Sequence, residues 1–387
     1  MGHGINFKNE KVFLEIAIFF QNWLVYPKDH QEQVIFEVSL LKGSIRMLKV
    51  AILGAGRIAQ IHSKSAFLNT QCELKLIADP WKEGVDKLAN ELNCEAGYDY
   101  YEAITRDDID AVVIATATDL HVDLMLHAVK HKKPVLCEKP IDLDFQRSIT
   151  AVEEIQSHNG KVMLAFNRRF DEDTIALKNA ILNNEIGDVR QVIITSRDPG
   201  MQPVEYMKTS GGIFKDMTIH DFDTARYILG EEPVEIFATA SRLVDEELAT
   251  INDYDTCSIT LKTKSGKQCI INNCREAVYG YDQRIEVLGS LGLLKTQNHR
   301  PSTLKKYAKN FTGSQQPLLN FFLERYTSSY RNEFNTFISS LVSQKEFPTS
   351  LFDGLQALYL AVCAMESVES GKAIAINPEG PAKNLAA

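Results

Sequence analysis

Residues 48–61 read LKVAILGAGRIAQI, and this stretch decides the fold. Its first part, Leu48–Leu53, is a run of aliphatic residues with no polar alternation after Lys49. Such a run is typical of a short strand buried on both faces, as strands are in a parallel sheet. A glycine-rich turn and a helical pattern follow without a break. We therefore expect a strand, a tight turn and the start of a helix.

The turn GAGRIA has the form G-x-G-x-x-A. Its first glycine allows the tight turn, its second lets a pyrophosphate approach bare backbone, and the alanine keeps the helix close to the strand. The first N–H groups of the helix stay free to bind phosphate. A turn that binds nothing is the alternative, but a strand before it and a helix after it favour a dinucleotide. The expected cofactor contacts here are Gly54, Gly56, Arg57, Ile58 and Ala59.

An acidic residue about twenty positions further on completes this pattern. Asp79 closes a second expected strand, Glu73–Ala78, and its carboxylate can accept hydrogen bonds from the ribose hydroxyls of the adenosine. The next residues are Pro80 and Trp81, with no arginine to meet a 2′-phosphate. NAD is therefore the expected cofactor, although Lys82 leaves NADP open.

Length and composition narrow the class of protein. A chain of 387 residues predicts two domains, and 44% hydrophobic residues are enough for a sizeable core. The net charge of −9 and the lack of a basic cluster argue against nucleic acid or an anionic membrane as partners. Seven scattered cysteines without a C-x-x-C motif indicate reduced thiols in a cytoplasmic protein. We expect no stretch long and apolar enough to span a membrane.

The first 46 residues do not fit the pattern of the rest. Val12–Phe20 is apolar except for Glu15 and could form one amphipathic helix. We expect residues 1–46 to be an upstream extension without a catalytic role, because Met47 stands just before the first strand. The alternative is an arm that packs on a neighbouring subunit. The intact mass of the natively expressed protein would distinguish the two.

From Met47 onward the pattern alternates strand and helix, which predicts a doubly wound α/β unit with a parallel sheet covered on both faces. After Leu48–Leu53 and Glu73–Ala78, the expected strands are Ala111–Ala115, Pro134–Cys137 and Lys161–Ala165. The expected helices are Ile58–Leu68, Lys82–Leu92, Leu120–Lys130 and Asp144–Ser157.

A different pattern follows, with a helix at Asp171–Asn184 and then a series of strands separated by turns. These strands are expected at Gln191–Ser196, Glu235–Ser241, Thr256–Lys262, Gln268–Cys274, Gln283–Leu288 and Leu291–Thr296. Ser265 and Gly266 form a hairpin turn. Meander order predicts one open, mainly antiparallel sheet, and helices at Tyr330–Val342 and Phe352–Glu369 close the chain.

Ligands of parallel sheets lie beyond the carboxyl ends of the strands. Two segments occupy those ends, one containing Thr116, Thr118 and His121 and the other containing Glu138 and Lys139. We expect all five residues to line the cofactor site. Lys139, beside the expected nicotinamide, can hydrogen-bond a substrate hydroxyl and help its proton leave. A solvated loop lysine is the alternative. The proline that follows, Pro140, is a candidate for a cis peptide bond.

The stretch GGIFKDMTIHDFD at 211–223 carries the expected chemistry. It predicts a helix in which Asp216 and His220, four residues apart, share one face. A histidine beside a carboxylate can act as a general base near neutral pH, and oxidation of an alcohol needs such a base. A surface pair is one alternative. Two metal ligands are another, although no third ligand follows at a convincing spacing and we predict no metal. Asp221 and Asp223 are expected to be structural.

These motifs together resemble the glucose–fructose oxidoreductase / inositol dehydrogenase / rhizopine-catabolism (Gfo/Idh/MocA) family. The resemblance rests on the glycine turn, Glu-Lys-Pro at 138–140, NRRFD at 167–171 and the stretch at 211–223, in this order and spacing. YGYDQR at 279–284 and MTIHDFD at 217–223 are closest to the inositol 2-dehydrogenase branch. Coverage runs from about Met47 to the C-terminus.

The resemblance implies a Rossmann domain at 47–168, an α+β substrate and oligomerisation domain at 169–387, and a homotetramer packed through the open sheet. It implies that Lys139, Asp216 and His220 are the catalytic trio: His220 takes the hydroxyl proton, Asp216 orients it and Lys139 holds the reacting oxygen. By the same resemblance, the substrate-binding residues are Arg168, Asp198 and Tyr281.

The expected function is therefore the NAD-dependent oxidation of a hydroxyl on a cyclic polyol or sugar, first of all myo-inositol at its 2-hydroxyl. A polar site of this kind discriminates by leaving groups unpaired when a hydroxyl is missing or inverted. Two alternatives stay open. One is a dehydrogenase for another inositol isomer or an aldose, and the other is a cofactor-binding regulator without chemistry. The presence of the whole trio argues against the regulator.

Overall fold

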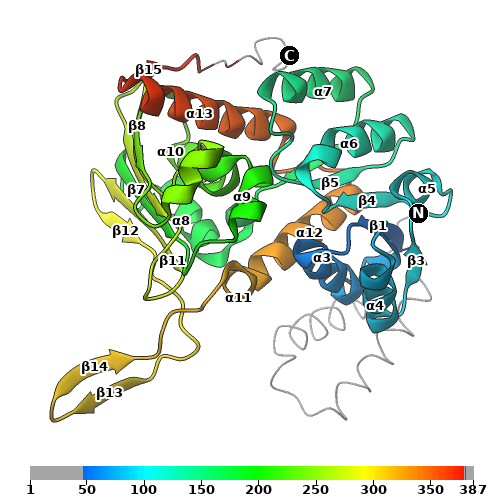
Figure 1. Cartoon of the computed structure of the whole chain (residues 1–387), viewed down its shortest axis with the longest axis horizontal. Coiled ribbons are helices and arrows are strands. Elements are labelled where there is room, and N and C mark those ends of the chain that lie inside the picture. The colour runs from blue at the N-terminus through cyan, green and yellow to red at the C-terminus, as the bar shows by residue number, and fades with distance from the viewer. Residues whose placement is uncertain (1–46, 379, 381–387) are drawn as a thin grey trace, which may run out of the picture.

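The computed structural model describes residues 47–378 and 380. The helix expected within residues 12–20, and the question of an extension or an arm, lie outside the described residues. Figure 1 shows two sheets side by side, with helices around the first and along one face of the second.

The first sheet is parallel throughout and has six strands in the order β3-β2-β1-β4-β5-β6. The strands are β1 Leu48–Leu53, β2 Cys72–Ala78, β3 Glu95–Gly97, β4 Ala111–Ile114, β5 Val135–Glu138 and β6 Val162–Ala165. The helices are α3 Arg57–Leu68, α4 Lys82–Leu92, α5 Tyr100–Thr105, α6 His121–Lys130 and α7 Phe145–Ser157. This confirms the predicted Rossmann arrangement. The sequence pattern missed β3 and α5, because three exposed or half-exposed residues and one and a half helical turns carry little periodicity.

The second sheet has seven strands in the order β12-β11-β7-β10-β9-β8-β15. They are β7 Val189–Arg197, β8 Pro233–Ser241, β9 Thr256–Thr263, β10 Gln268–Cys274, β11 Asp282–Gly289, β12 Leu293–Lys295 and β15 Ile374–Ala375. All neighbours are antiparallel except β7 and β10, which confirms an open, mainly antiparallel sheet. The expectation of simple meander order was wrong, because β7 lies between β10 and β11.

Helices α10 Ile219–Leu229 and α13 Leu351–Ser370 pack against one face of this sheet, next to α8 Glu172–Leu182 and α9 Val204–Ser210 (Figure 1). The 20-residue α13 is long and apolar enough to cross a membrane, so our expectation that no such stretch exists was wrong. Most of its apolar window is buried in the protein, where it contacts β8, α10 and α7. A core helix of a globular fold meets the same test of length and composition.

The last long helices return to the first sheet. Helix α12 Thr327–Ser343 follows the short α11 Phe322–Arg325 and packs against α3. Its Phe334, Phe337 and Ile338 belong to the same buried apolar cluster as Val50 and Ile52 of β1. Segments nearly three hundred residues apart therefore complete one core.

A hairpin of β13 Lys305–Ala308 and β14 Phe311–Gln315 projects from the body of the molecule (Figure 1). Nearly all of its side chains are exposed, and the sequence pattern did not predict it.

Candidate active site

The glycine turn has the geometry that a dinucleotide requires. Gly54 has a φ of 120°, and a Cβ there would lie 2.5 Å from the carbonyl oxygen of Ala115 on the neighbouring strand end. Only glycine fits, because both the backbone conformation and the space exclude a side chain. A Cβ on Gly56 would meet nothing within 4 Å. The backbone at Gly56 is thus open to a ligand.

The N-terminus of α3 offers free donors beside this opening. No side chain caps the helix and its first turn holds no acidic residue. Orphan N–H groups at such an end bind anions well. Ala59 is fully buried, as its packing role requires, whereas Arg57 is exposed and donates to Gln202 at 3.4 Å. The residues at this turn therefore fit a bound pyrophosphate.

Asp79 lies at the end of β2, beside the turn. Its Oδ2 accepts from the backbone N–H of Ala55 at 2.9 Å, and its Oδ1 accepts from that of Trp81 at 2.8 Å. A carboxylate has about four lone-pair sites, so acceptor capacity remains for ribose hydroxyls. Asp79 thus fixes the turn as well as standing where the adenosine ribose is expected.

The two loops after β4 and β5 are joined by His121. Its Nδ1 lies 2.8 Å from the carbonyl oxygen of Pro140, and its Nε2 lies 3.3 Å from that of Thr116. Burial lowers the pKa of His121, so the ring is neutral near pH 7 and has one N–H to donate. His121 therefore braces the cofactor-side loops from beneath. Thr118 opens the short helical turn that follows Thr116.

Lys139 reaches from the end of β5 toward the second sheet. Its Nζ donates to the backbone carbonyl of Asp216 at 2.7 Å and lies 3.5 Å from the Asp216 Oδ1. The side chain is largely buried, which excludes the solvated-loop alternative. The Lys139–Pro140 peptide bond is cis, as the sequence suggested.

Asp216 lies in a π-helical turn, η4 Phe214–Thr218, rather than in the expected continuous α-helix. The wider i→i+5 turn disrupts the stacking of residues four apart. The carboxylate faces Lys139, the Tyr206 hydroxyl at 3.4 Å and the Arg275 Nη1 at 3.4 Å. No hydrogen bond joins it to His220 within residues 47–378. The predicted direct orientation of His220 by Asp216 is therefore not what the structure has.

His220 is the second residue of α10, directly after the π-helical turn, and its ring packs edge-on against Phe166. Burial lowers the pKa of its imidazole well below the usual histidine value, and the positive charges of Lys139 and Arg168 lower it further. Its Nδ1 is buried without a partner in the described part of the chain. A neutral imidazole that is close enough to feel the charge of Lys139 is suited to accept a proton.

Arg168 is held in a buried network. Its Nη1 donates to the Ser196 hydroxyl at 3.0 Å and to the Asp221 carboxylate, which also accepts from the Asn273 amide at 2.7 Å. Asp223 pairs with Arg169 in the same way. Asp221 and Asp223 are thus structural, as expected.

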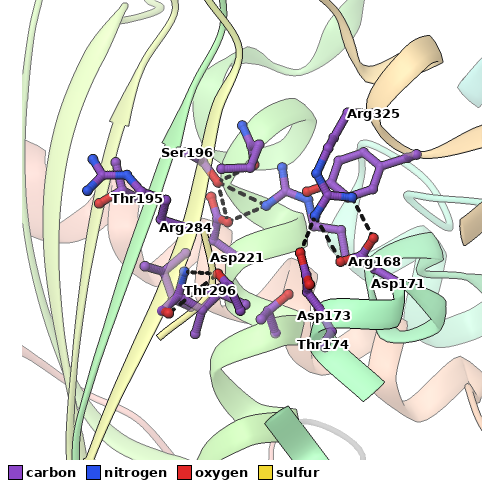
Figure 2. Close-up of a pocket in the computed structure, with 15 residues that line it drawn as sticks. Arg168, Asp171, Asp173, Thr174, Thr195, Ser196, Asp221, Arg284, Thr296 and Arg325 are labelled. Atoms are coloured by element: carbon purple, nitrogen blue, oxygen red, sulfur yellow. Dashed lines mark hydrogen bonds and ion pairs between the residues drawn. The ribbon is translucent and has the colours of Figure 1, made fainter. Parts of the chain in front are cut away.

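A small pocket lies beside this network, and Figure 2 shows the residues that line it. Arg168, Ser196 and Asp221 form one side of it, and Asp171, Asp173 and Arg325 line it as well. None of Lys139, Asp216 and His220 lines it. The pocket is therefore separate from Lys139, Asp216 and His220, and it is not the place where these three residues could act on a substrate.

Asp198 and Tyr281 are brought to the same region. Burial raises the pKa of Asp198 to about 7, with the charges of Arg275, Asp216 and Arg168 also acting on it. Tyr281 is buried edge-on against Tyr326, and both Arg168 and Asp198 are close enough to affect its pKa, which burial raises well above the usual value. Together with the trio, they form one buried polar region at the junction of the two sheets.

Glu138 is the last residue of β5, and its contact in the structure is with His62. Its Oε1 lies 2.7 Å from the His62 Nε2, and its side chain is largely buried.

Arg275 is the residue that the sequence interpretation missed. Its side chain is fully buried, and it pairs with Asp216 at 3.4 Å and with Asp253 at 3.6 Å. Its Nε and Nη2 have no hydrogen-bond partner among the described residues. The available signal was an arginine directly after the buried strand β10, in the segment Asn272–Arg275.

Comparisons with known proteins identify the family of the chain. Residues 48–166 match the model of the oxidoreductase family with an NAD-binding Rossmann fold, and residues 174–295 match that of the GFO/IDH/MocA C-terminal domain. The inositol 2-dehydrogenase of Rhizobium meliloti is 45% identical over 330 residues, covering 85% of this chain and 99% of that protein.

Solved structures extend the similarity to the fold. A myo-inositol dehydrogenase from Corynebacterium glutamicum is 43% identical with a TM-score of 0.83, covering 86% of this chain and 99% of that one. A scyllo-inositol dehydrogenase from Lactobacillus casei, with bound NAD(H) and scyllo-inositol, is 26% identical with a TM-score of 0.79, covering 85% and 99%. The chain thus belongs to the GFO/IDH/MocA family of NAD-binding oxidoreductases.

Proposed function

We propose that this protein oxidises myo-inositol at its 2-hydroxyl to the ketone 2-keto-myo-inositol (scyllo-inosose), with NAD as the hydride acceptor. The observation that carries the proposal is the contact of Lys139 with Asp216, which joins the cofactor-side sheet to the π-helical turn before His220. The similarity to inositol dehydrogenases supports the substrate class. A cyclic polyol is uncharged and rich in hydroxyls, which suits a region that mixes donors and acceptors.

In the proposed mechanism, His220 is neutral in the resting enzyme and accepts the proton of the reacting hydroxyl. The Lys139 ammonium holds that oxygen and stabilises the negative charge that grows on it. Asp216 keeps the Lys139 side chain in place, and Arg275 and Tyr206 hold Asp216. Bound NAD supplies the acceptor for the hydride.

We assign the flanking residues to the ligands. Arg168, Asp198 and Tyr281 bind the substrate ring at the junction of the two sheets. Gly56 and the N-terminus of α3 bind the pyrophosphate, Asp79 the adenosine ribose, and the Thr116 and Lys139 loops the nicotinamide half. We place His121 and Glu138 beneath these loops as their support.

We further propose a homotetramer that works in the cytoplasm. The face of the second sheet opposite its helices carries exposed apolar residues, among them Phe237 and Leu288. An exposed apolar face of this kind marks an interaction surface. All seven cysteines are free thiols in the structure, as is typical of a reducing compartment.

The decisive experiment measures NADH formation by the full-length protein with a panel of substrates. The panel contains myo-inositol, scyllo-inositol and glucose, each with NAD and then with NADP. We expect the highest kcat/KM with myo-inositol and NAD. A higher kcat/KM with an aldose would move the assignment to a sugar dehydrogenase, and binding of NAD without turnover of any polyol would indicate a regulator.

Replacement of the proposed base tests the mechanism. His220→Ala should lower kcat by about 10²- to 10⁴-fold, the usual contribution of a general base, while NAD still binds. Unchanged NADH formation in this variant would exclude His220 as the proton acceptor.

A further inference from the structure

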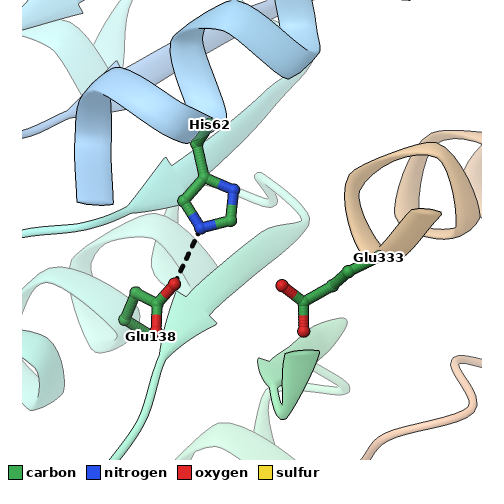
Figure 3. Close-up of side chains that lie close together, drawn as sticks. All are labelled: His62, Glu138 and Glu333. Carbon is green, nitrogen blue, oxygen red and sulfur yellow. Dashed lines mark hydrogen bonds and ion pairs between the residues drawn. The ribbon is translucent and has the colours of Figure 1, made fainter. Parts of the chain in front are cut away.

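Three titratable side chains from distant elements meet beneath the Lys139 loop (Figure 3). His62 comes from α3, Glu138 from the end of β5 and Glu333 from α12. One ring nitrogen of His62 and one carboxylate oxygen of each glutamate lie within 4.8 Å of one another. His62 and Glu333 are fully buried and Glu138 is 8% exposed. None of the three belongs to the proposed reaction.

Glu333 is the unusual member. Both of its carboxylate oxygens are buried without a hydrogen-bond partner in the described part of the chain. Figure 3 shows its carboxylate directed at the other two side chains, whereas Glu138 already pairs with His62 at 2.7 Å. An ionised carboxylate that is buried and unpaired is strongly unfavourable.

The neighbours of Glu333 make its ionisation still less favourable. The titratable groups that face it are Glu138 from β5, His62 from α3 and Tyr330 from its own helix, which packs edge-on against His62. Burial raises the pKa of Glu333 well above its usual value, and the negative charge of Glu138 raises it further. Both effects act in the same direction, so the folded protein favours the protonated form of Glu333 over its ionised form.

We propose that Glu333 is a positioning residue for Lys139: as a neutral acid it donates its O–H to one water that bridges to the Glu138 carboxylate, and it thereby holds the strand end that carries the lysine. Glu138 immediately precedes Lys139, so a shift of the backbone at the end of β5 would also move the lysine, whose Nζ contacts Asp216 at 2.7 Å. His62 ties the same point to α3, the helix that begins at the glycine turn. The proposal rests on the assigned role of Lys139 but also predicts a protonation state that can be observed without turnover.

The proton on Glu333 should make the free energy of unfolding depend on pH. A carboxyl group with a raised pKa in the folded state binds its proton more tightly there than in the unfolded chain. Its contribution to stability is fully present below the ordinary glutamic acid pKa and is lost as the pH rises toward the folded pKa. Above that value two negative charges face each other, and the Lys139 loop should be displaced.

The test compares Glu333→Gln with the wild type in the full-length protein. Glutamine keeps the shape and the hydrogen-bond donor of the neutral acid but has no proton to lose. Glu346→Gln is the matched control, because Glu346 is an exposed residue just beyond the end of α12. The melting temperature is measured from pH 5 to pH 9, and infrared spectroscopy records the C=O stretch of a protonated carboxyl group.

We expect the melting temperature of the wild type and of E346Q to fall as the pH rises above the ordinary glutamic acid pKa. E333Q should give a flatter curve and melt about 1–2 °C higher than the wild type at alkaline pH, the shift that about 1 kcal/mol gives in a chain of this length. At neutral pH the protonated-carboxyl band should be weaker in E333Q than in the wild type and E346Q, and the part that remains in E333Q belongs to Asp198, whose pKa burial raises to about 7. E333Q should retain turnover with its alkaline limb moved to higher pH, whereas E333A should lose turnover.

Two results would overturn the proposal. One is an E333Q protein that melts lower than the wild type at every pH with the same slope, which would mean that Glu333 acts as an ionised partner. The other is one equivalent of divalent metal in the purified wild type, absent from E333Q and removable by a chelator at a cost in melting temperature. If the wild type oxidises no inositol, the proposed function fails, whereas the melting curves and the infrared band still decide the state of Glu333.

Discussion

His220 is the residue on which the pH dependence of the proposed reaction rests. Because burial and the charges of Lys139 and Arg168 lower its pKa, it should stay unprotonated at pH values where an ordinary histidine is half charged. We expect the acid limb of kcat/KM to lie below about pH 6.5, the usual histidine pKa. The profile is measured by NADH formation. His158→Ala, at an exposed position after α7, should leave it unchanged.

The charge of Lys139 should influence the acid limb of the kcat/KM profile. Lys139→Met removes a positive charge that lowers the pKa of His220, so the titration of His220 should move upward toward the ordinary histidine value. NMR of the imidazole ring protons measures this without turnover. Lys139→Arg keeps the charge but not the shape, so it should leave the titration low while kcat falls. Equal titrations in K139M and the wild type would show that the two side chains do not interact.

At the scale of elements, the two glycines of the turn have different roles: Gly54 is needed for the fold, and Gly56 is needed for binding. Gly54 has a φ of 120° and no room for a Cβ, whereas Gly56 has open space around it. We expect Gly54→Ala to lower the melting temperature by several degrees. Gly56→Ala should melt like the wild type but raise the Kd for NAD at least about tenfold, or about 1.4 kcal/mol. Calorimetric titration with NAD measures the second effect. Normal NAD binding by G56A would place the pyrophosphate elsewhere.

Some of the helices and strands were predictable from the sequence, and others were not. Strong periodicity and glycine chemistry predicted β1, α3 and α4, whose bounds are nearly those of the structure. The π-helical turn at Phe214–Thr218 was not predictable, because local sequence does not distinguish an i→i+5 turn from an α-helix. The pairing of β7 with β10 also depends on contacts far along the chain.

Long-range burial explains the site residues that were missed. Arg275 follows an ordinary strand, and only the fold shows that it is buried against Asp216. Glu333 lies on a helix with the pattern of a surface position, and only the packing of α12 on α3 buries its carboxylate.

At the scale of the whole molecule, the open sheet should determine assembly. Phe237 is 41% exposed on the face opposite the helices, and we expect Phe237→Asp to dissociate the proposed tetramer into smaller species. Size-exclusion chromatography with light scattering measures the mass. Leu182→Asp, at the exposed last residue of α8, is the control and should leave the mass unchanged. A wild-type protein that elutes as a monomer at micromolar concentration would contradict the tetramer.

Helix α12 has a consequence for how the chain can be divided and synthesised. A fragment that stops near residue 168 would lack Phe334, Phe337 and Ile338, which cover the apolar side of β1. Such a fragment would expose this apolar surface to water and precipitate, although it contains every proposed cofactor-binding residue. During translation the nucleotide-binding domain likewise cannot complete its core until the ribosome has synthesised α12.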